Sequence, residues 1–338
     1  MSAIYVPEEL TPRGPADATP ARRPGSLRRT TTIDMTWSDG LGTDLWLAGR
    51  GRDLLTPERG APVVLHEERV DVDVSPGRKV LHFALRAAPD GEPREIDELV
   101  GSGAMGGFRA TVADQVPELQ DPGRPSSLLV DDTPGATLIS GFAAAQWIPV
   151  ERLLEISQAK GHTRPMVGIC TGFMPGSSGL APDGSSRWTH RTCAVRPLAE
   201  DPDPWAWHEV AEISEMSMRR MRRIDVWLEG ELIRVDAMFQ DSATTPDGGR
   251  VAVHEYGLTA TAGLRTGELL EVIPEPRVLP YAECPLATRQ VHRLVGVPLA
   301  DLREVVLTSL AGTAGCTHLN DALRALGDVP AMARSLQT

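Results

Sequence analysis

The residues of this chain that could do chemistry are cysteines and histidines gathered in its last third. The segment Gly-Cys-Thr-His-Leu at 315–319 supplies Cys316 and His318, and it opens a stretch with helical spacing. Cys284 directly precedes Pro285, a residue suited to the first turn of a helix. Backbone amides at a helix start favour a thiolate. The sequence therefore predicts two cysteines at two helix starts.

A bound metal is the chemistry that these residue types suit best, because thiolate and imidazole are good ligands for zinc and iron. The candidate ligands are His254, Cys284, Cys316 and His318. Their spacing fits no compact zinc-finger pattern, so the fold has to bring them together. The expected function is a metal-binding protein, with zinc or iron as the cofactor. A catalytic metal would polarise a carbonyl or activate water in a hydrolase or lyase, with Glu255 or His318 transferring the proton.

Other roles stay open for the same residues. Cys316 could be the nucleophile of an acyl-transfer enzyme, activated by the helix start and by His318 or His254. Cys284 and Cys316 could instead be small buried apolar side chains, which is what free cysteines usually are. The protein would then be a non-catalytic scaffold of an enzyme complex. A small-molecule substrate and a protein partner both remain possible.

Short segments of the first half return in the second half in the same order. Residues 28–34 return as 219–225, residues 63–67 as 251–255, residues 99–101 as 294–296, and residues 135–138 as 315–318. The offsets drift by loop-sized amounts, as divergence after a duplication would produce. In the last match, Ala136 and Leu138 stand where the second copy has Cys316 and His318. The sequence therefore predicts that the second copy alone kept a site.

The order of the expected elements is the same in both halves. Alternating apolar residues predict strands near 30–37, 44–50, 63–74 and 79–87, and again near 221–228, 231–239, 251–260 and 269–273. Helices are expected near 95–100, 108–119 and 137–147, and near 285–295, 299–310 and 317–326. This order is typical of an α+β protein. We expect two similar domains, each an antiparallel strand meander followed by helices packed on one face.

Four segments are expected along the chain. They are a flexible tail at 1–25, a degenerate first copy at 26–150, a connecting segment or lid at 151–215, and a second copy at 216–330 that carries the site. Three tryptophans, Trp188, Trp205 and Trp207, favour an ordered connection, since large aromatic side chains are rarely left in solvent.

The charge of the chain limits its partners. A formal net charge of -12 argues against nucleic acid and against an anionic membrane. No apolar stretch is long enough to span a membrane, and no secretory signal is visible. Four cysteines make no disulfide framework, so a cytoplasmic location is expected. The arginines at 22–23, 28–29 and 219–223 are expected at solvated strand edges, where charge prevents edge-to-edge pairing.

Residues 251–323 resemble the bacterial domain-of-unknown-function family 2889. The resemblance lies in His254-Glu255, in Tyr-Ala-Glu-Cys-Pro at 281–285, in Leu-Val-Gly at 294–296 and in the segment 315–319. The first copy resembles a degenerate member that keeps His66 and residues 99–101. This family has no settled activity, so the resemblance implies a domain and not a reaction.

The order of strands and cysteine-led helices is also similar to that of iron–sulfur cluster scaffold proteins, in which cysteines hold zinc or a cluster. This similarity implies that His254, Cys284 and Cys316 converge at one end of the sheet, with His318 beside them.

Overall fold

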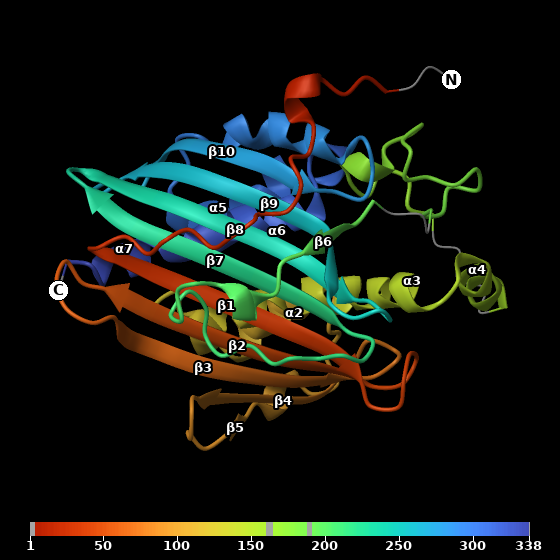
Figure 1. Cartoon of the computed structure of the whole chain (residues 1–338), viewed down its shortest axis with the longest axis horizontal. Coiled ribbons are helices and arrows are strands. Elements are labelled where there is room, and N and C mark those ends of the chain that lie inside the picture. Colours follow the sequence, from red (N-terminus) through yellow and green to blue (C-terminus); the bar gives the residue numbers. More distant parts are fainter. Residues whose placement is uncertain (1–3, 160–164, 188–190, 338) are drawn as a thin grey trace.

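The computed structural model describes residues 4–159, 165–187 and 191–337. The strands of the first half are β1 (Ser26–Trp37), β2 (Leu45–Thr56), β3 (Val63–Val74), β4 (Val80–Ala87) and β5 (Arg94–Glu95). Those that follow are β6 (Cys193–Val195), β7 (Met218–Glu229), β8 (Leu232–Thr244), β9 (Arg250–Gly263) and β10 (Leu269–Val278). Within the described residues they form one antiparallel sheet, ordered β10-β9-β8-β7-β1-β2-β3-β4-β5, with β6 on β9 (Figure 1).

The helices are α1 (Phe108–Gln115), α2 (Pro125–Ile139), α3 (Ala144–Trp147), α4 (Val150–Ala159), α5 (Leu302–Ser309), α6 (Thr317–Arg324) and α7 (Val329–Arg334). Short 3-10 segments accompany them: η1 (Glu8–Leu10), η2 (Asp97–Leu99), η3 (Pro117–Gln120), η4 (Ser140–Ala143), η5 (Thr171–Phe173), η6 (Leu198–Glu200), η7 (Cys284–Leu294), η8 (Leu299–Asp301), η9 (Gly312–Ala314) and η10 (Ala325–Asp328). The expected α+β class is confirmed.

The helices pack on one face of the sheet (Figure 1). The longest of them, α2, packs on β1, β2 and β3. Sequence reasoning missed all of it before residue 137, because Pro125, Pro134 and an adjacent pair of aspartates argue against a helix. Pro125 stands in the first turn, where its missing N–H leaves no bond unmade. None of the described helices has the length and apolar character needed to cross a membrane.

β1 and β7 join the two halves at the middle of the sheet. They are antiparallel, with Ser26 opposite Trp227 and Met35 opposite Met218. The two strand meanders therefore share one continuous sheet, and they do not pack as two separate domains. The cores interlock accordingly, because Leu27 of β1 packs in the core of the C-terminal half and Met218 of β7 packs in the core of the N-terminal half.

Of the arginines expected at solvated strand edges, those at 28–29 and 219–223 lie instead in the central strands β1 and β7, where they are buried, while Arg22 and Arg23 precede β1. Arg28 Nε lies 2.6 Å from Asp225 Oδ1, and Arg219 Nε lies 2.6 Å from Asp34 Oδ1, so that two ion pairs cross the β1–β7 junction. The edge expectation was wrong because a guanidinium can be buried when a carboxylate satisfies it. The carboxylates here come from distant parts of the chain.

The opposite face of the sheet is covered by chain that has little regular structure (Figure 1). Residues 4–25, expected as a flexible tail, are held on this face. The amide of Ala16 donates to Glu255 Oε1 at 2.7 Å, and Trp207 Nε1 donates to Thr19 Oγ1 at 2.9 Å. Trp207 is buried, Trp205 is 40% exposed, and Trp188 lies outside the described residues.

Candidate metal centre

Two rows of Arg, Asp and His cross the sheet on its helix-covered face. In each row the three residues are direct neighbours on adjacent strands: Arg220, Asp241 and His254 on β7, β8 and β9, and Arg29, Asp53 and His66 on β1, β2 and β3. In both rows the strand register shifts directly after the aspartate, at a β-bulge. Directly paired residues on adjacent strands point to the same face of a sheet, so that the aspartate and the histidine of each row lie on the same side.

The carboxylate of Asp241 is fully buried, and Arg220 on the neighbouring strand β7 binds it. Arg220 Nε lies 2.9 Å from Asp241 Oδ1 and Arg220 Nη2 lies 3.1 Å from Oδ2, which is a bidentate pair. Arg220 Nη1 also donates to Asp321 Oδ2 of α6 at 2.9 Å. Gly135 of α2 makes room for this guanidinium, since a Cβ at that position would collide with Arg220. The charge of Asp241 is therefore fixed and compensated.

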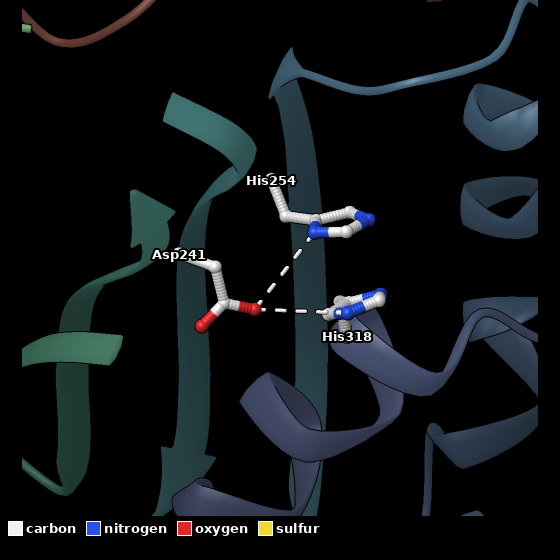
Figure 2. A group of neighbouring side chains, drawn as sticks. All are labelled: Asp241, His254 and His318. Atoms are coloured by element: carbon white, nitrogen blue, oxygen red, sulfur yellow. Dashed lines mark ion pairs between the residues drawn. The ribbon is translucent and has the colours of Figure 1, made fainter. Parts of the chain in front are cut away.

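His318 adds an imidazole to the second row. Its ring stacks on that of His254, with centroids 3.4 Å apart and planes inclined by 14°. His254 Nδ1 lies 3.8 Å and His318 Nε2 lies 3.6 Å from the same oxygen, Asp241 Oδ2 (Figure 2). The donor atoms of these three side chains lie within 4.8 Å of one another. Among the described residues, this group could hold a metal ion.

The imidazole of His318 is neutral at physiological pH. Burial, and then the charges of Arg220 and Arg222, lower its pKa to about 3. Two charged rings stacked at this distance would repel each other, whereas two neutral rings do not. Neutral imidazole is also the form that binds metals. The His318 ring is thus in the form that binds metals, and Figure 2 shows that each of the two rings turns its second nitrogen away from Asp241.

Cys316 lies next to His318, as the sequence predicts. It is the N-cap residue of α6, and its Sγ lies 3.9 Å from His318 Nδ1. Burial raises the pKa of the Cys316 thiol, although the nearby Leu319 amide and Tyr256 hydroxyl oppose that rise. Burial therefore outweighs the effect of the helix start on this thiol.

Cys284 begins η7 and is buried. Burial, followed by the neighbouring thiols of Cys316 and Cys170, raises its pKa well above the usual range. Cys170 comes from the connecting segment, and sequence reasoning did not include it in the site. The thiols of Cys170 and Cys284 both lie beside Gly172. A Cβ added to this glycine would stand 3.9 Å from the sulfur of Cys170 and 2.7 Å from the sulfur of Cys284. Three thiols therefore gather beside α6.

Part of the connecting segment covers these thiols. Thr171 donates from its amide and from Oγ1 to the carbonyl of Gly315, at 2.9 and 2.8 Å. Glu283 accepts bonds from the amide and hydroxyl of Ser178, at 3.0 and 2.6 Å. The segment around 170–180 thus packs against the start of α6, while the segment after β6 lies on the other face of the sheet.

Glu255 is not brought together with the histidines. Successive residues of a strand point to opposite faces, so Glu255 points away from the face on which its neighbour His254 lies. Its carboxylate is fully buried, and it accepts bonds from Gln240 Nε2 at 2.8 Å and from the amide of Ala16. Proton transfer between Glu255 and a metal bound at His318 would have to cross the sheet.

Three of the four sequence matches between the halves join equivalent places in the fold. The first two supply the arginine and the histidine of the two rows, and the third supplies a shared turn. Gly101 and Gly296 both have positive φ, 82° and 88°. The amide of Gly101 donates to Val80 and the amide of Gly296 donates to Leu269, each carbonyl being at 2.8 Å and at the start of the fourth strand of its half. The Leu-Val-Gly segments therefore make the same turn.

The match of residues 135–138 with 315–318 was wrong. Ala136 and Leu138 lie in the last turn of α2, whereas Cys316 caps the start of α6. Tyr256, two residues after His254, lies beside Cys316. Glu68, two residues after His66, accepts a bond of 2.6 Å from Arg124, the N-cap residue of α2.

Residues 218–332, about a third of the chain, match the family model described as Protein of unknown function (DUF2889). This span begins with β7 and contains the second Arg-Asp-His row, Cys284, Cys316 and His318. The family resemblance of this region is confirmed, and the similarity to iron–sulfur scaffolds stays a prediction. No curated protein matches the chain. A solved structure titled "Crystal structure of lipopolysaccharide binding protein" shares 8% identity over 74% of this chain and 70% of that chain, with a TM-score of 0.12.

Proposed function

We propose that the C-terminal half is a zinc-binding domain in which His254, His318 and Cys316 hold the metal. The observation that carries this proposal is the stacked pair of imidazoles over one buried carboxylate, with a thiol 3.9 Å from His318 Nδ1. In a tetrahedral zinc site, bonds of about 2.0–2.1 Å to nitrogen and 2.3 Å to sulfur place the nitrogen and the sulfur roughly 3.6 Å from each other. A small rotation of either side chain would reach that separation.

Asp241 supports the ligands in this proposal and does not bind zinc itself. Metal-bound histidines commonly donate their second N–H to a carboxylate, which fixes the ring orientation. Asp241 Oδ2 faces one nitrogen of each ring, and Arg220 already holds both of its oxygens. A dication bound directly to Asp241 would stand beside this buried guanidinium, which Coulomb repulsion disfavours. Cys284, with a thiol close to that of Cys316, is the candidate fourth ligand.

The burial of these side chains favours a structural role over catalysis. His254 and Cys316 are each 4% exposed, whereas a catalytic zinc keeps one position open to water or substrate. Zinc here would tie α6 to β9 and stabilise the C-terminal half. The raised pKa of Cys316 also argues against the alternative of a nucleophilic thiol, which needs to ionise near neutral pH.

The proposal extends to the origin of the chain. An internal duplication would account for the two Arg-Asp-His rows and the two Leu-Val-Gly turns, with zinc binding confined to the second copy. In the first half, Arg124 and Glu68 would supply an ion pair where the second half has a thiol and Tyr256.

Metal analysis of the purified full chain tests the proposal, with His66 as the matched control. We expect about one zinc per chain in the wild type and in His66→Leu, and a large loss in His318→Leu, each variant being checked for folding by circular dichroism. Negligible zinc in the wild type, or equal zinc in His318→Leu, would remove the proposal.

A further inference from the structure

The face of the sheet opposite the candidate metal centre carries a large cavity. Its volume is about 1310 Å³. The floor is formed by β7, β8, β9 and β10, and the walls are the N-terminal segment and the chain that follows β6. Figure 1 shows both of these segments crossing the sheet on this side. Cavities of this size are large enough for small-molecule ligands.

Most cations that line the cavity have a carboxylate partner. The pairs are Arg13 and Arg277 with Glu275, Arg219 with Asp34, Arg223 with Asp225 and Asp236, and Arg196 with Glu200. These guanidinium groups are neutralised within the protein. An external anion would gain little by binding beside these guanidinium groups, because a carboxylate already compensates each of them.

Arg250, the first residue of β9, differs from these cations. It forms no ion pair with any carboxylate that the structure describes. Its bonds go to neutral groups: Nε to Ser242 Oγ at 3.1 Å, Nη2 to the Ser242 carbonyl at 2.9 Å and Nη1 to Ser217 Oγ at 3.4 Å. Burial and the nearby charge of Arg219 lower its pKa to about 9, so it is still charged at neutral pH. A half-buried guanidinium with no carboxylate partner among the described residues favours binding of an anion.

An apolar surface lies in the same cavity. Trp207 and Met221 form a small core cluster, and Leu198, Val210 and Met238 pack against it. All five of these side chains line the cavity. Methionines adapt their shape to ligands, and an aromatic ring supplies rigid contact area. Ser242, which Arg250 contacts, and Met221 lie on adjacent strands near one end of the cavity floor. The apolar surface therefore begins close to Arg250.

We propose that this cavity binds an amphipathic organic anion. The acidic group pairs with Arg250, and the apolar part lies against Trp207, Met221 and Met238. A fork of N–H donors matches a carboxylate or a phosphate, so the two acid groups share this recognition chemistry. The site is independent of the proposed zinc, since the sheet separates them.

Isothermal titration calorimetry of the full chain with decanoate and with decyl phosphate tests this inference, and decylamine serves as the cationic control. We expect one decanoate or decyl phosphate per chain, no binding of decylamine, and a loss of at least tenfold in affinity in Arg250→Met. Arg13→Met, which removes a lining arginine already paired with Glu275, should bind as the wild type does. The tighter of the two anions identifies the acid group.

A second variant keeps the inference testable if Arg250→Met fails to fold. Met238→Glu places a carboxylate in the apolar part of the cavity and should abolish binding of both anions. Lack of binding by the wild type, or equal binding by the wild type and whichever of the two variants folds, would overturn the inference. Zinc content is unaffected in all of these variants if the two sites are independent.

Discussion

Arg28 of β1 and Asp225 of β7 lie directly opposite each other, with Nε 2.6 Å from Oδ1, and this ion pair ties the first half of the chain to the second. The reciprocal pair of Arg219 with Asp34 lies further along the same two strands. Both pairs are buried. The central strand pair of the sheet therefore depends on charges supplied by both halves.

The C-terminal half is expected not to fold alone, although residues 218–332 match one family model. In a fragment of residues 216–338, Arg219 would lose Asp34 and Arg220 would lose Asp132. β7 would become an unpaired edge strand, which favours aggregation. Circular dichroism and gel filtration of the fragment should show an unfolded or aggregated chain. A monomer that unfolds cooperatively would contradict this expectation.

Removing one partner of a buried pair at the junction should destabilise the protein strongly. Asp34→Asn leaves the guanidinium of Arg219 buried and uncompensated, and the loss in unfolding free energy should be about 3–5 kcal/mol. The control is Glu118→Gln, which breaks the exposed pair of Glu118 with Arg94 and should have a far smaller effect, because exposed ion pairs contribute little to stability. Urea unfolding of the three proteins measures both values. Similar losses in the two variants would show that burial does not govern these pairs.

These buried arginines mark the limit of what the sequence predicts. Strand alternation locates most elements, and the types of His254, Cys316 and His318 indicate a metal. Asp241 was missed, although it continues the inward-facing series Val235, Ala237, Phe239 and so places an acid on the core face. An acid at such a position indicates a buried partner. The partner itself depends on long-range strand pairing, which local patterns do not reveal.

Acid should destabilise the protein through His208. This imidazole is buried between the hydroxyls of Thr30 and Thr32, and burial lowers its pKa from the usual 6.5 to about 3. The unfolded chain therefore binds one more proton than the folded chain between these values. The stability contributed by the neutral ring is complete above pH 6.5 and is lost as the pH falls toward 3.

The size of this effect follows from proton linkage. In the range from about pH 6 to 4.5, His208 should contribute a slope of up to about 1.4 kcal/mol per pH unit to the unfolding free energy. His208→Gln should reduce the slope of the wild type by that amount, as measured by urea unfolding at several pH values. Equal slopes in the two proteins would contradict the assigned pKa.

Thiol labelling should separate the four cysteines by burial. Cys170, Cys284 and Cys316 are buried and have raised pKa values, while Cys193 is half-buried. Iodoacetamide at pH 8 should therefore modify Cys193 first in the folded protein, as peptide mass mapping would show. Rapid and selective modification of Cys316 at mildly acidic pH would instead support the nucleophile alternative.

X-ray absorption at the zinc edge of the full chain tests the proposed centre most directly. We predict a nearest shell of two imidazole nitrogens at about 2.0–2.1 Å together with sulfur at about 2.3 Å, and loss of the sulfur contribution in Cys316→Ser. A shell of nitrogen and oxygen alone would mean that Asp241 binds the metal in place of the thiol. A protein that retains no zinc would contradict the metal centre altogether.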